Sequence, residues 1–379
     1  MRVRILSSVI VGLLAVGWLG GATAASANSG AKVTMTTVVS GLDNPRDLAF
    51  DEDGKLYVAE AGHGGTSCFT IPGLGQNCVG FTSAISRVNV SRSSAKRVVT
   101  GLVSTASPDG SFATGVDGIS ILGERIFGIE TGASLAVPPG VVPASVEARA
   151  KRQLGRLILA DDEGRWESVA NVGDRDFRWS ADHADLVPGQ FPDANPYGLL
   201  ALHGSRWVVD AGSNTLDRVS KRGHVKVEAF IPNPPSSDAV PTCIDRGPDK
   251  ALYIGELTGG GNAPGASVVW RYDPETDTLT KWAQGLTAVT GCGFAPNGTF
   301  YATEFSSLGL DNAAPNTGRV VMVPAHSTAP VTIVDGLSFP GGFAAGCDGS
   351  LYVSDWSVAP ATGPPGAPTG SVVRITLHS

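Results

Sequence analysis

The stretch Leu-Tyr-Val-Ala-Glu at Leu56–Glu60 decides the fold, because variants of it recur along the chain. In each copy a short run containing a bulky or aromatic residue ends in an acidic residue, and the last four copies follow one another at intervals of roughly 50 residues. The other copies are Ile126–Glu130, Trp207–Asp210, Leu252–Glu256, Phe300–Glu304 and Leu351–Asp355. Six copies at such a period are typical of radial or stacked repeat proteins.

Every repeat has the pattern of short β-strands separated by turn residues. The fourth repeat predicts four strands, at Val240–Ile244, Ala251–Gly255, Ser267–Asp273 and Thr278–Ala283, and the fifth ends with strands at Gly318–Pro324 and Val331–Val334. Helical periodicity is nearly absent, and the one helix that we expect lies in an insertion of the second repeat, at Ala144–Leu154.

The two ends of the chain complete one repeat between them. The sixth repeat stops after its third strand, Gly370–Leu377, whereas Val33–Ser40 forms an extra strand before the first repeat. Pairing of these two strands would close a ring and remove exposed sheet edges. We therefore predict an all-β fold, a six-bladed β-propeller of four-stranded antiparallel blades, closed by the N-terminal strand on the last blade.

The first residues have the pattern of an export signal. Arg2 and Arg4 precede the apolar stretch Ile5–Leu19, and Ala25–Ala27 provides an A-x-A cleavage site. We expect residues 1–27 to be a cleaved signal peptide and 28–379 to form a single propeller domain. The apolar stretch is short for a transmembrane span, which needs about 20 residues. The protein is therefore expected to be secreted or held at the cell envelope.

The charge balance limits the partners that we expect. The chain carries a net charge of −7 and has no basic stripe, which argues against nucleic acid and against anionic membrane surfaces. Cations and neutral molecules suit this charge better. We expect a monomer whose partner, unknown from the sequence, is a small molecule or an extracellular protein.

Five cysteines allow two disulfides in an exported protein. Cys68 and Cys78 flank a short glycine-rich loop, and Cys243 and Cys292 occupy nearly the same position in consecutive repeats. We expect each of these two pairs to form a disulfide, which leaves Cys347 unpaired. No C-x-x-C motif is present.

The acidic residue that ends each repeated phrase allows two interpretations. Some of these side chains could converge on Ca²⁺, which prefers several oxygen ligands. Alternatively, each carboxylate accepts backbone N–H bonds and ties its blade to the next, a need that recurs in every blade; this second interpretation is favoured. The six residues are Glu60, Glu130, Asp210, Glu256, Glu304 and Asp355.

The segments that lead into the innermost strands carry the residues that break the repeat. Their equivalent positions hold Arg46, Asp117, Tyr197, Thr242 and Thr290, with Gly341 as the sixth member. A cation, an acid, a phenol and two hydroxyls at axial positions suggest a polar, asymmetric ligand site at the mouth of the propeller. The alternative is that they only bond to neighbouring strands or to water in the channel.

The longest insertion, Asp174–Asp193, combines carboxylates with the aromatic residues Phe177, Trp179 and Phe191. It suits a lid over the mouth, and it equally suits a loop folded on its own apolar cluster. Its Asp182-His183 pair could bind a metal or move a proton, so His183 is included among the candidate ligand-binding residues.

The chain resembles the ScyD/ScyE family of exported β-propeller proteins. The resemblance covers nearly the whole expected mature chain and implies a six-bladed propeller related to the NHL and TolB-like groups. It implies no catalytic residues, and Cys347 departs from the family pattern. The stretches that carry it are 41–50 (GLDNPRDLAF), 114–120 (TGVDGIS), 191–200 (FPDANPYGLL), 208–216 (VVDAGSNTL), 230–242 (FIPNPPSSDAVPT), 255–259 (GELTG), 285–294 (GLTAVTGCGF) and 338–344 (SFPGGFA).

Three functions remain open from the sequence. A non-catalytic binding module is favoured, because the chain has no G-x-S-x-G, H-E-x-x-H, P-loop or EF-hand motif. A hydrolase or lactonase of the gluconolactonase type would need Ca²⁺, the possible cofactor, at Asp117, Asn195, Asp238 and Glu256. A sugar or quinone oxidoreductase would need a histidine near the axis, where only His63 or His183 could lie. Whether the protein is an enzyme is left undecided at this point.

Overall fold

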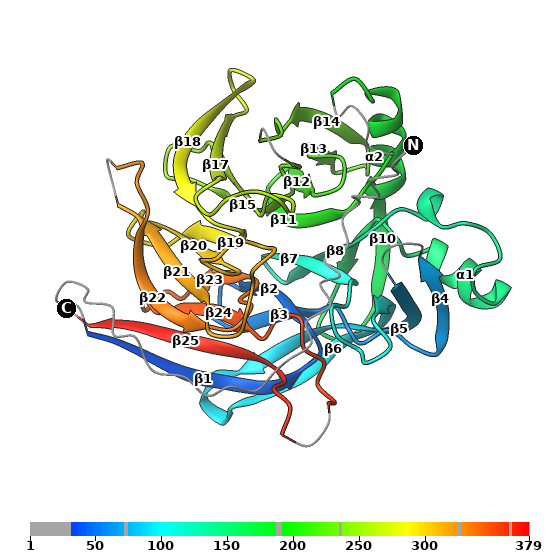
Figure 1. Ribbon diagram of the computed structural model, residues 1–379, viewed down its shortest axis with the longest axis horizontal. Helices are drawn as coiled ribbons and strands as arrows, with labels where there is room; N and C mark the ends of the chain where they lie inside the picture. Colours follow the sequence, from blue (N-terminus) through cyan, green and yellow to red (C-terminus); the bar gives the residue numbers. More distant parts are fainter. Residues whose placement is uncertain are drawn as a thin grey trace.

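A computed structural model describes residues 32–71, 75–186, 192–234, 237–324, 327–363 and 366–378. Six antiparallel sheets stand around a common axis, as Figure 1 shows face on. The predicted all-β, six-bladed propeller is confirmed. The expected signal peptide, residues 1–27, lies outside the described residues, and the single domain 28–379 stays a prediction.

The first three blades follow one another along the chain. Blade 1 has the order β2-β3-β5-β6, with β4 paired to the first half of β5. The strands of blade 1 are β2 (Pro45–Phe50), β3 (Leu56–Glu60), β4 (Ser67–Ile71), β5 (Gly75–Asn89) and β6 (Ser94–Ala106). Those of blade 2 are β7 (Val116–Leu122), β8 (Arg125–Glu130), β9 (Arg156–Ala160) and β10 (Trp166–Asn171). Those of blade 3 are β11 (Pro196–Leu202), β12 (Ser205–Asp210), β13 (Thr215–Ser220) and β14 (Val225–Phe230).

The last three blades repeat the same meander. Their strands are β15 (Pro241–Arg246), β16 (Leu252–Glu256), β17 (Ser267–Asp273) and β18 (Thr278–Leu286) in blade 4, β19 (Val289–Phe294), β20 (Phe300–Glu304), β21 (Gly318–Val323) and β22 (Val331–Leu337) in blade 5, and β23 (Phe343–Ala345), β24 (Leu351–Asp355), β25 (Gly370–His378) and β1 (Lys32–Leu42) in blade 6. Each strand predicted for the fourth and fifth repeats matches one of these within a few residues.

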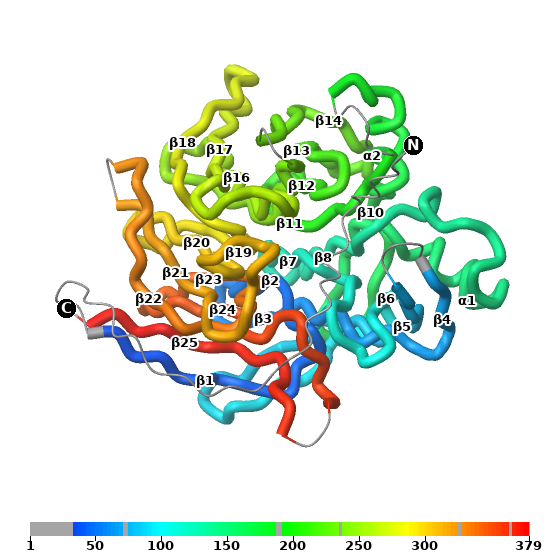
Figure 2. The backbone as a smooth tube through the Cα atoms, viewed as in Figure 1, coloured from blue at the N-terminus to red at the C-terminus, as the bar shows by residue number. Residues whose placement is uncertain are grey.

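The N-terminal strand closes the ring as predicted. Strand β1 pairs antiparallel with β25 over its whole length, from Lys32 opposite His378 to Leu42 opposite Gly370. In the tube of Figure 2 the blue N-terminal strand runs beside the red C-terminal strand at the outer side of blade 6. The first and last parts of the chain therefore share one sheet.

The core lies between the blades. The second strands β3, β16 and β20 are buried along their whole length, because both of their faces meet apolar side chains. Six apolar clusters each draw residues from two neighbouring blades, such as Cys243, Tyr253 and Val269 of blade 4 with Phe300 and Val321 of blade 5. The ring is thus held together by side chains that face the adjacent blade.

Both predicted disulfides are present. Cys68–Cys78 joins directly opposite residues of the β4–β5 hairpin, and Cys243–Cys292 joins the innermost strands β15 and β19 of blades 4 and 5. Cys347 is unpaired and exposed.

Two α-helices lie outside the blades of the described chain. The predicted helix is α1 (Ala144–Lys151), and a second helix, α2 (Val172–Asp182), lies in the insertion between blades 2 and 3, where no helix was predicted. Short 3₁₀ turns are η1 (Val90–Arg92) and η2 (Ser134–Ala136). None of the helices in the described residues is long and apolar enough to cross a membrane.

Candidate functional site: an axial pocket

The segment leading into the innermost strand has the same local geometry in four blades. Asn44, Val240, Ala288 and Phe339 adopt left-handed φ angles of 49°, 53°, 49° and 50°. Each carbonyl accepts the N–H of a residue just after the second strand of the same blade, for example Leu257 N to Val240 O at 2.9 Å. Such backbone conformations need support from their surroundings, and these bonds supply it.

The residue two positions after each left-handed residue is the one that the repeat alignment singled out: Arg46, Thr242, Thr290 and Gly341. Arg46, Asp117, Tyr197, Thr242 and Thr290 all line one pocket at the propeller axis, of about 730 Å³ including open solvent at its mouth. The structure therefore brings together the five predicted ring residues. Their role in ligand binding stays a prediction.

The mouth of this pocket is apolar. Leu257, Phe305 and Val358 are buried in one cluster with Phe112 and Val240 packed against it, and all five line the pocket. These side chains give the pocket hydrocarbon walls beside its polar lining residues, among them Thr114, Asn195 and Ser357.

The polar floor is asymmetric. Arg46 Nε lies 3.4 Å from Asp117 Oδ1, and Arg46 Nη2 donates a hydrogen bond to the carbonyl of Ala113. Thr242 Oγ1 and Thr290 Oγ1 each donate to a backbone carbonyl of the next blade, those of Val289 and Pro340, both at 2.8 Å. These hydroxyls keep lone pairs with which they can accept a bond from a ligand.

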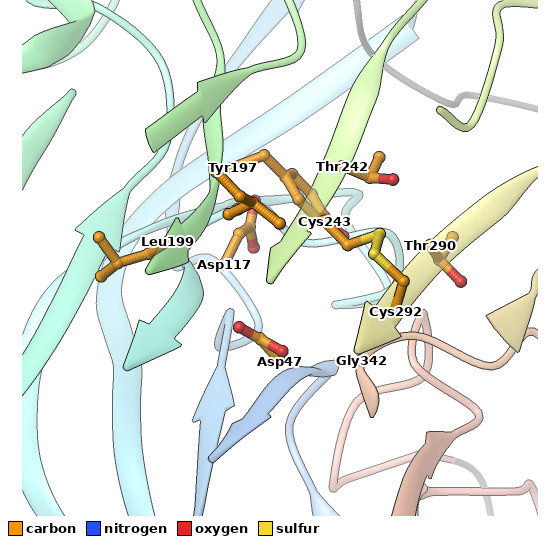
Figure 3. A pocket seen from close by; sticks show the side chains of 11 residues that line it. Asp47, Asp117, Tyr197, Leu199, Thr242, Cys243, Thr290, Cys292 and Gly342 are labelled. Carbon is orange, nitrogen blue, oxygen red and sulfur yellow. A yellow bond between two sulfur atoms is a disulfide. The ribbon is translucent and has the colours of Figure 1, made fainter. Parts of the chain in front are cut away.

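A second chamber lies deeper along the axis. It shares Asp117, Tyr197, Thr242 and Thr290 with the mouth and extends to Asp47, Leu199 and Ile244, which come later on the innermost strands. Figure 3 shows Asp47 and Asp117 on one side of it and the Cys243–Cys292 disulfide on the other. It has room for a group of the size of a water molecule or an ammonium.

Close approach of the innermost strands makes this chamber narrow. The position after the ring residue faces the neighbouring blade, and a Cβ on Gly118 would lie 2.2 Å from the carbonyl oxygen of Tyr197. The same holds for Gly198, whose Cβ would lie 2.7 Å from the carbonyl oxygen of Thr242. Blade 1 has Asp47 at this position, and its carboxylate accepts hydrogen bonds from Leu48 N at 2.8 Å and Ile119 N at 3.2 Å.

Burial shifts the acidity of the groups around the axis. Desolvation raises the pKa of Asp117 to about 6, against the opposing effect of the Arg46 charge. Burial also raises the pKa of Asp47 to about 7, although two backbone hydrogen bonds act in the other direction. The phenol of Tyr197 has its pKa raised to about 12 by burial, so it stays protonated. Both carboxylates can therefore change charge near neutral pH.

The repeated acids mostly have the structural role that we favoured. Glu60, Asp210, Glu304 and Asp355 accept hydrogen bonds from backbone N–H groups of the lead-in segments of their own blades. The donors are Asp43, Asn195, Thr287 and Ser338, at 2.7, 2.7, 2.9 and 2.7 Å. Each acid thus fastens the connection that arrives from the preceding blade, and Glu256 instead accepts from the indole Nε1 of Trp270.

Glu130 departs furthest from this scheme. It is fully buried, and neither of its carboxylate oxygens has a hydrogen-bond partner among the described residues. The corresponding backbone N–H, on Thr114, donates to Thr105 instead. Burial, and then the nearby Asp117, raise the pKa of Glu130 well above its usual value. Blades 2 and 4 therefore lack the shared bond, and in blade 2 the acid has no replacement partner among the described residues.

The four residues expected to hold calcium are not assembled into one site. Asp117 and Asn195 both line the pocket, whereas Glu256 contacts Trp270 and Asp238 accepts a hydrogen bond from the Asn214 amide. Within the described ranges, no three or more His, Cys, Asp or Glu side chains are grouped so as to hold a metal ion.

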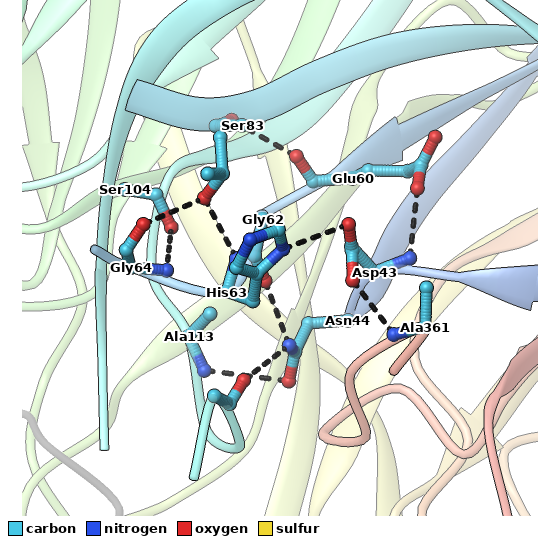
Figure 4. Close-up of polar contacts among 12 residues, drawn as sticks. Asp43, Asn44, Glu60, Gly62, His63, Gly64, Ser83, Ser104, Ala113 and Ala361 are labelled. Carbon is cyan, nitrogen blue, oxygen red and sulfur yellow. Dashed lines mark hydrogen bonds and ion pairs between the residues drawn. The ribbon is translucent and has the colours of Figure 1, made fainter. Parts of the chain in front are cut away.

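Neither candidate histidine lines the axial pocket. His63 Nδ1 lies 3.0 Å from Asp43 Oδ2, in the polar network of Figure 4 that joins the lead-in segment of blade 1 to the loops around it. His183 follows helix α2, where its ring stacks on Trp179 with centroids 4.2 Å apart. His183 is therefore not brought together with the five ring residues.

The described part of the Asp174–Asp193 insertion packs on the blades. Helix α2 contacts β9, β14 and η2, and Trp179 lies 6.0 Å from Phe230 between ring centroids. Trp179 thus packs both on His183 of the insertion itself and on blade 3. Phe191 lies outside the described residues.

Sequence reasoning missed two parts of the site. Leu257 and Phe305 of the apolar mouth could have been found, because each directly follows the repeated acid of its blade, whereas Phe112 and Val358 have no such marker. Asp47 could have been found, because it directly follows Arg46 on the same strand and alternation turns it towards the next blade. The lower chamber becomes visible only when the strands of six blades are placed around one axis.

No family model matches the chain, and no curated protein matches it in sequence. Among solved structures it is similar to an auxiliary nutrient binding protein from Bacteroides thetaiotaomicron, with 10% identity over 92% of this chain and 78% of the other and a TM-score of 0.54. It is also similar to a luciferin-regenerating enzyme, with 12% identity over 92% and 95% of the two chains and a TM-score of 0.52.

A third similar structure is the PQQ-bound form of aldose sugar dehydrogenase from Streptomyces coelicolor, with 13% identity over 92% of this chain and 99% of the other and a TM-score of 0.50. These neighbours have different functions, and at such low identity the likeness concerns the fold alone. Membership of the ScyD/ScyE family stays a prediction. The comparisons and the strand order together show a six-bladed β-propeller.

Proposed function

We propose that this protein is a non-catalytic binding module of the cell exterior or envelope, which holds a small amphipathic molecule in the axial pocket. The observation that carries the proposal is the pocket itself, with hydrocarbon walls at its mouth and Arg46, Asp117, Tyr197 and two threonines at its floor. This combination is typical of small-molecule sites.

The state of the floor groups supports binding rather than covalent catalysis. Thr242 and Thr290 donate their hydroxyl protons to backbone carbonyls, not to a side-chain base that could activate them. Arg46 and Asp117 face each other as an ion pair. The two disulfides fit an oxidising location, and the ScyD/ScyE resemblance agrees with export.

Ligand-observed NMR with a library of amphipathic fragments tests this function. Leu257→Trp adds volume to the pocket wall, so fragments that bind the wild-type protein should lose their signal in this variant. Leu308→Trp is the matched control, because Leu308 is 47% exposed and does not line the pocket. Binding that is unchanged in Leu257→Trp, or equally lost in both variants, would contradict a ligand site at the axis.

A further inference from the structure

The axial cavity carries an excess of negative charge. Of the described residues that line its two chambers, three are charged: Arg46, Asp47 and Asp117. With both carboxylates ionised the lining therefore has one negative charge more than positive. In a cavity of low polarity, such a charge favours a cationic occupant far more strongly than it would in water.

Asp117 has an oxygen that its surroundings do not satisfy. Its side chain is only 1% exposed, and Oδ1 has no hydrogen-bond partner among the described residues. The nearest cation, Arg46 Nε, lies 3.4 Å away and is itself without a hydrogen bond among those residues. A buried carboxylate oxygen in this state is costly unless a donor reaches it, and Asp117 faces both chambers.

Asp47 provides the second acceptor, from the deeper end. Its two oxygens each accept one backbone N–H, which leaves one lone pair or more on each oxygen for a further donor. Asp47 and Asp117 face the same narrow chamber in Figure 3. An ammonium carries three donors and is small enough for this space.

The remaining lining suits the rest of such a molecule. The ring of Tyr197 lies beside the two carboxylates, and its face can stabilise a cation. Above it, the walls formed by Val240, Leu257, Phe305 and Val358 can cover a hydrocarbon or aromatic body. The apolar walls thus belong to the outer chamber, and the second carboxylate, Asp47, belongs to the inner one.

From this juxtaposition we infer that the ligand is an amphipathic organic cation, a primary amine whose ammonium is held between Asp117 and Asp47 and whose apolar body fills the mouth. The inference rests on the proposed function and names the class of ligand for the same pocket. The ammonium would take part of the role of Arg46 towards Asp117, so Arg46 competes with it.

Three probes with one skeleton test the charge preference: phenylbutylamine, phenylbutanol and phenylbutyrate, each titrated calorimetrically into the purified mature protein at pH 8. The amine should bind at least about tenfold more tightly than the alcohol, since its ammonium makes charged hydrogen bonds to the carboxylates that a hydroxyl cannot make. The carboxylate should bind most weakly.

Two substitutions should shift amine binding in opposite directions. Asp47→Asn removes an anion and should weaken amine binding about tenfold or more, with little effect on the affinity for the alcohol. Arg46→Gln removes the competing cation and should strengthen amine binding. Loss of folding cannot produce this pair of results, and melting temperatures of both variants verify that they are folded.

Equal affinity for amine and alcohol, or a shift of amine binding in the same direction in both variants, would overturn the inference. If the protein binds phenylbutanol and phenylbutylamine equally well, and Leu257→Trp abolishes this binding, the proposed function is supported and the inference of a cationic ligand is wrong. If no probe binds and the fragment library also gives no ligand at the pocket, the proposed function and the inference of a cationic ligand are both wrong.

Discussion

At the scale of the residue, three buried carboxyl groups meet where helix α2 lies against blade 3. Asp176 on α2, Asp210 at the end of β12 and Asp217 on β13 have no measurable exposure. Neither oxygen of Asp176 has a hydrogen-bond partner among the described residues. Burial, and then the charges of Asp217 and Asp210, raise the pKa of Asp176 well above its usual value. Burial also raises the pKa of Asp217 to about 8 and that of Asp210 to about 6.

Asp176→Asn should therefore stabilise the protein at neutral pH. An acid whose folded pKa is raised binds its proton more tightly in the folded state, so ionisation lowers stability as the pH rises from about 4 through the folded pKa. The amide removes one charge and can donate to Asp210 Oδ2 and Asp217 Oδ1, which lack donors among the described residues. A gain of about 1 kcal/mol or more is expected.

Thermal melts of wild type and variant from pH 4 to pH 8 check this expectation. The variant should melt higher at pH 8, and the difference should shrink towards pH 4, where the wild-type carboxyl groups are protonated. A variant that melts lower at pH 8 would show that the ionised Asp176 carboxylate has a stabilising partner in the folded protein.

Repeat alignment predicts single residues well where the blades are equivalent. Arg46, Asp117, Tyr197, Thr242 and Thr290 were placed together because the position recurs, and the structure brings them to one pocket. Asp176 and Glu130, whose carboxylates have no hydrogen-bond partner among the described residues, could not be found in this way. Their environments depend on contacts between segments far apart in the chain, and on the loss of a backbone hydrogen bond that four other blades retain.

At the scale of the element, helix α2 shows why one prediction was missed. Its buried face carries Val172, Gly173, Asp174, Asp176 and Ser180, which are mostly small or polar, so no apolar stripe with a helical period marks it. The side chain of Asn171 caps the helix by accepting from Asp174 N at 3.1 Å. The strands, by contrast, follow from turn residues and β-branched runs, which are local signals.

The two disulfides should differ in their effect on stability. Cys243–Cys292 closes a loop with a sequence separation of 49 and joins two blades, whereas Cys68–Cys78 spans 10 within one hairpin. Loop-closure entropy gives about 4 kcal/mol for the first and about 2.7 kcal/mol for the second. Replacing Cys243 and Cys292 by serine should therefore lower the melting temperature more than replacing Cys68 and Cys78.

Calorimetric melts of the two double variants measure this difference. Each is compared with wild type and with Cys347→Ser, which removes an exposed thiol without breaking a disulfide. A larger loss for the hairpin pair would mean that the link between β15 and β19 contributes little to holding blades 4 and 5 together.

At the scale of the whole molecule, closure of the ring by β1 is the feature on which cooperativity depends. Removing β1 would leave β25 as an open edge and would expose the apolar cluster that Val38, Val39 and Leu42 share with blade 1. A chain that starts at Asp43 should therefore unfold at a much lower temperature or aggregate, whereas one that starts at Asn28 should behave as the expected mature protein.

Circular dichroism melts and size-exclusion chromatography of these two chains test the role of closure. A chain starting at Asp43 that stays monomeric and keeps the melting temperature of the longer chain would contradict it. Closure could be predicted from the sequence because the sixth repeat lacks a fourth strand, whereas one additional strand precedes the first repeat. In the pocket walls, Leu257 and Phe305 could have been found from the same repeat, because each directly follows a repeated acid, whereas Phe112 and Val358 have no repeated position.

The central claim, that the axial pocket holds an amphipathic amine, is tested most directly by a crystal structure of the mature protein with phenylbutylamine. The amine nitrogen should lie within hydrogen-bonding distance of Asp117 Oδ1 and the Asp47 carboxylate, with the phenyl ring against Leu257 and Phe305. Phenylbutylamine bound elsewhere on the protein, or bound in the pocket with its ammonium turned to the solvent, would contradict it.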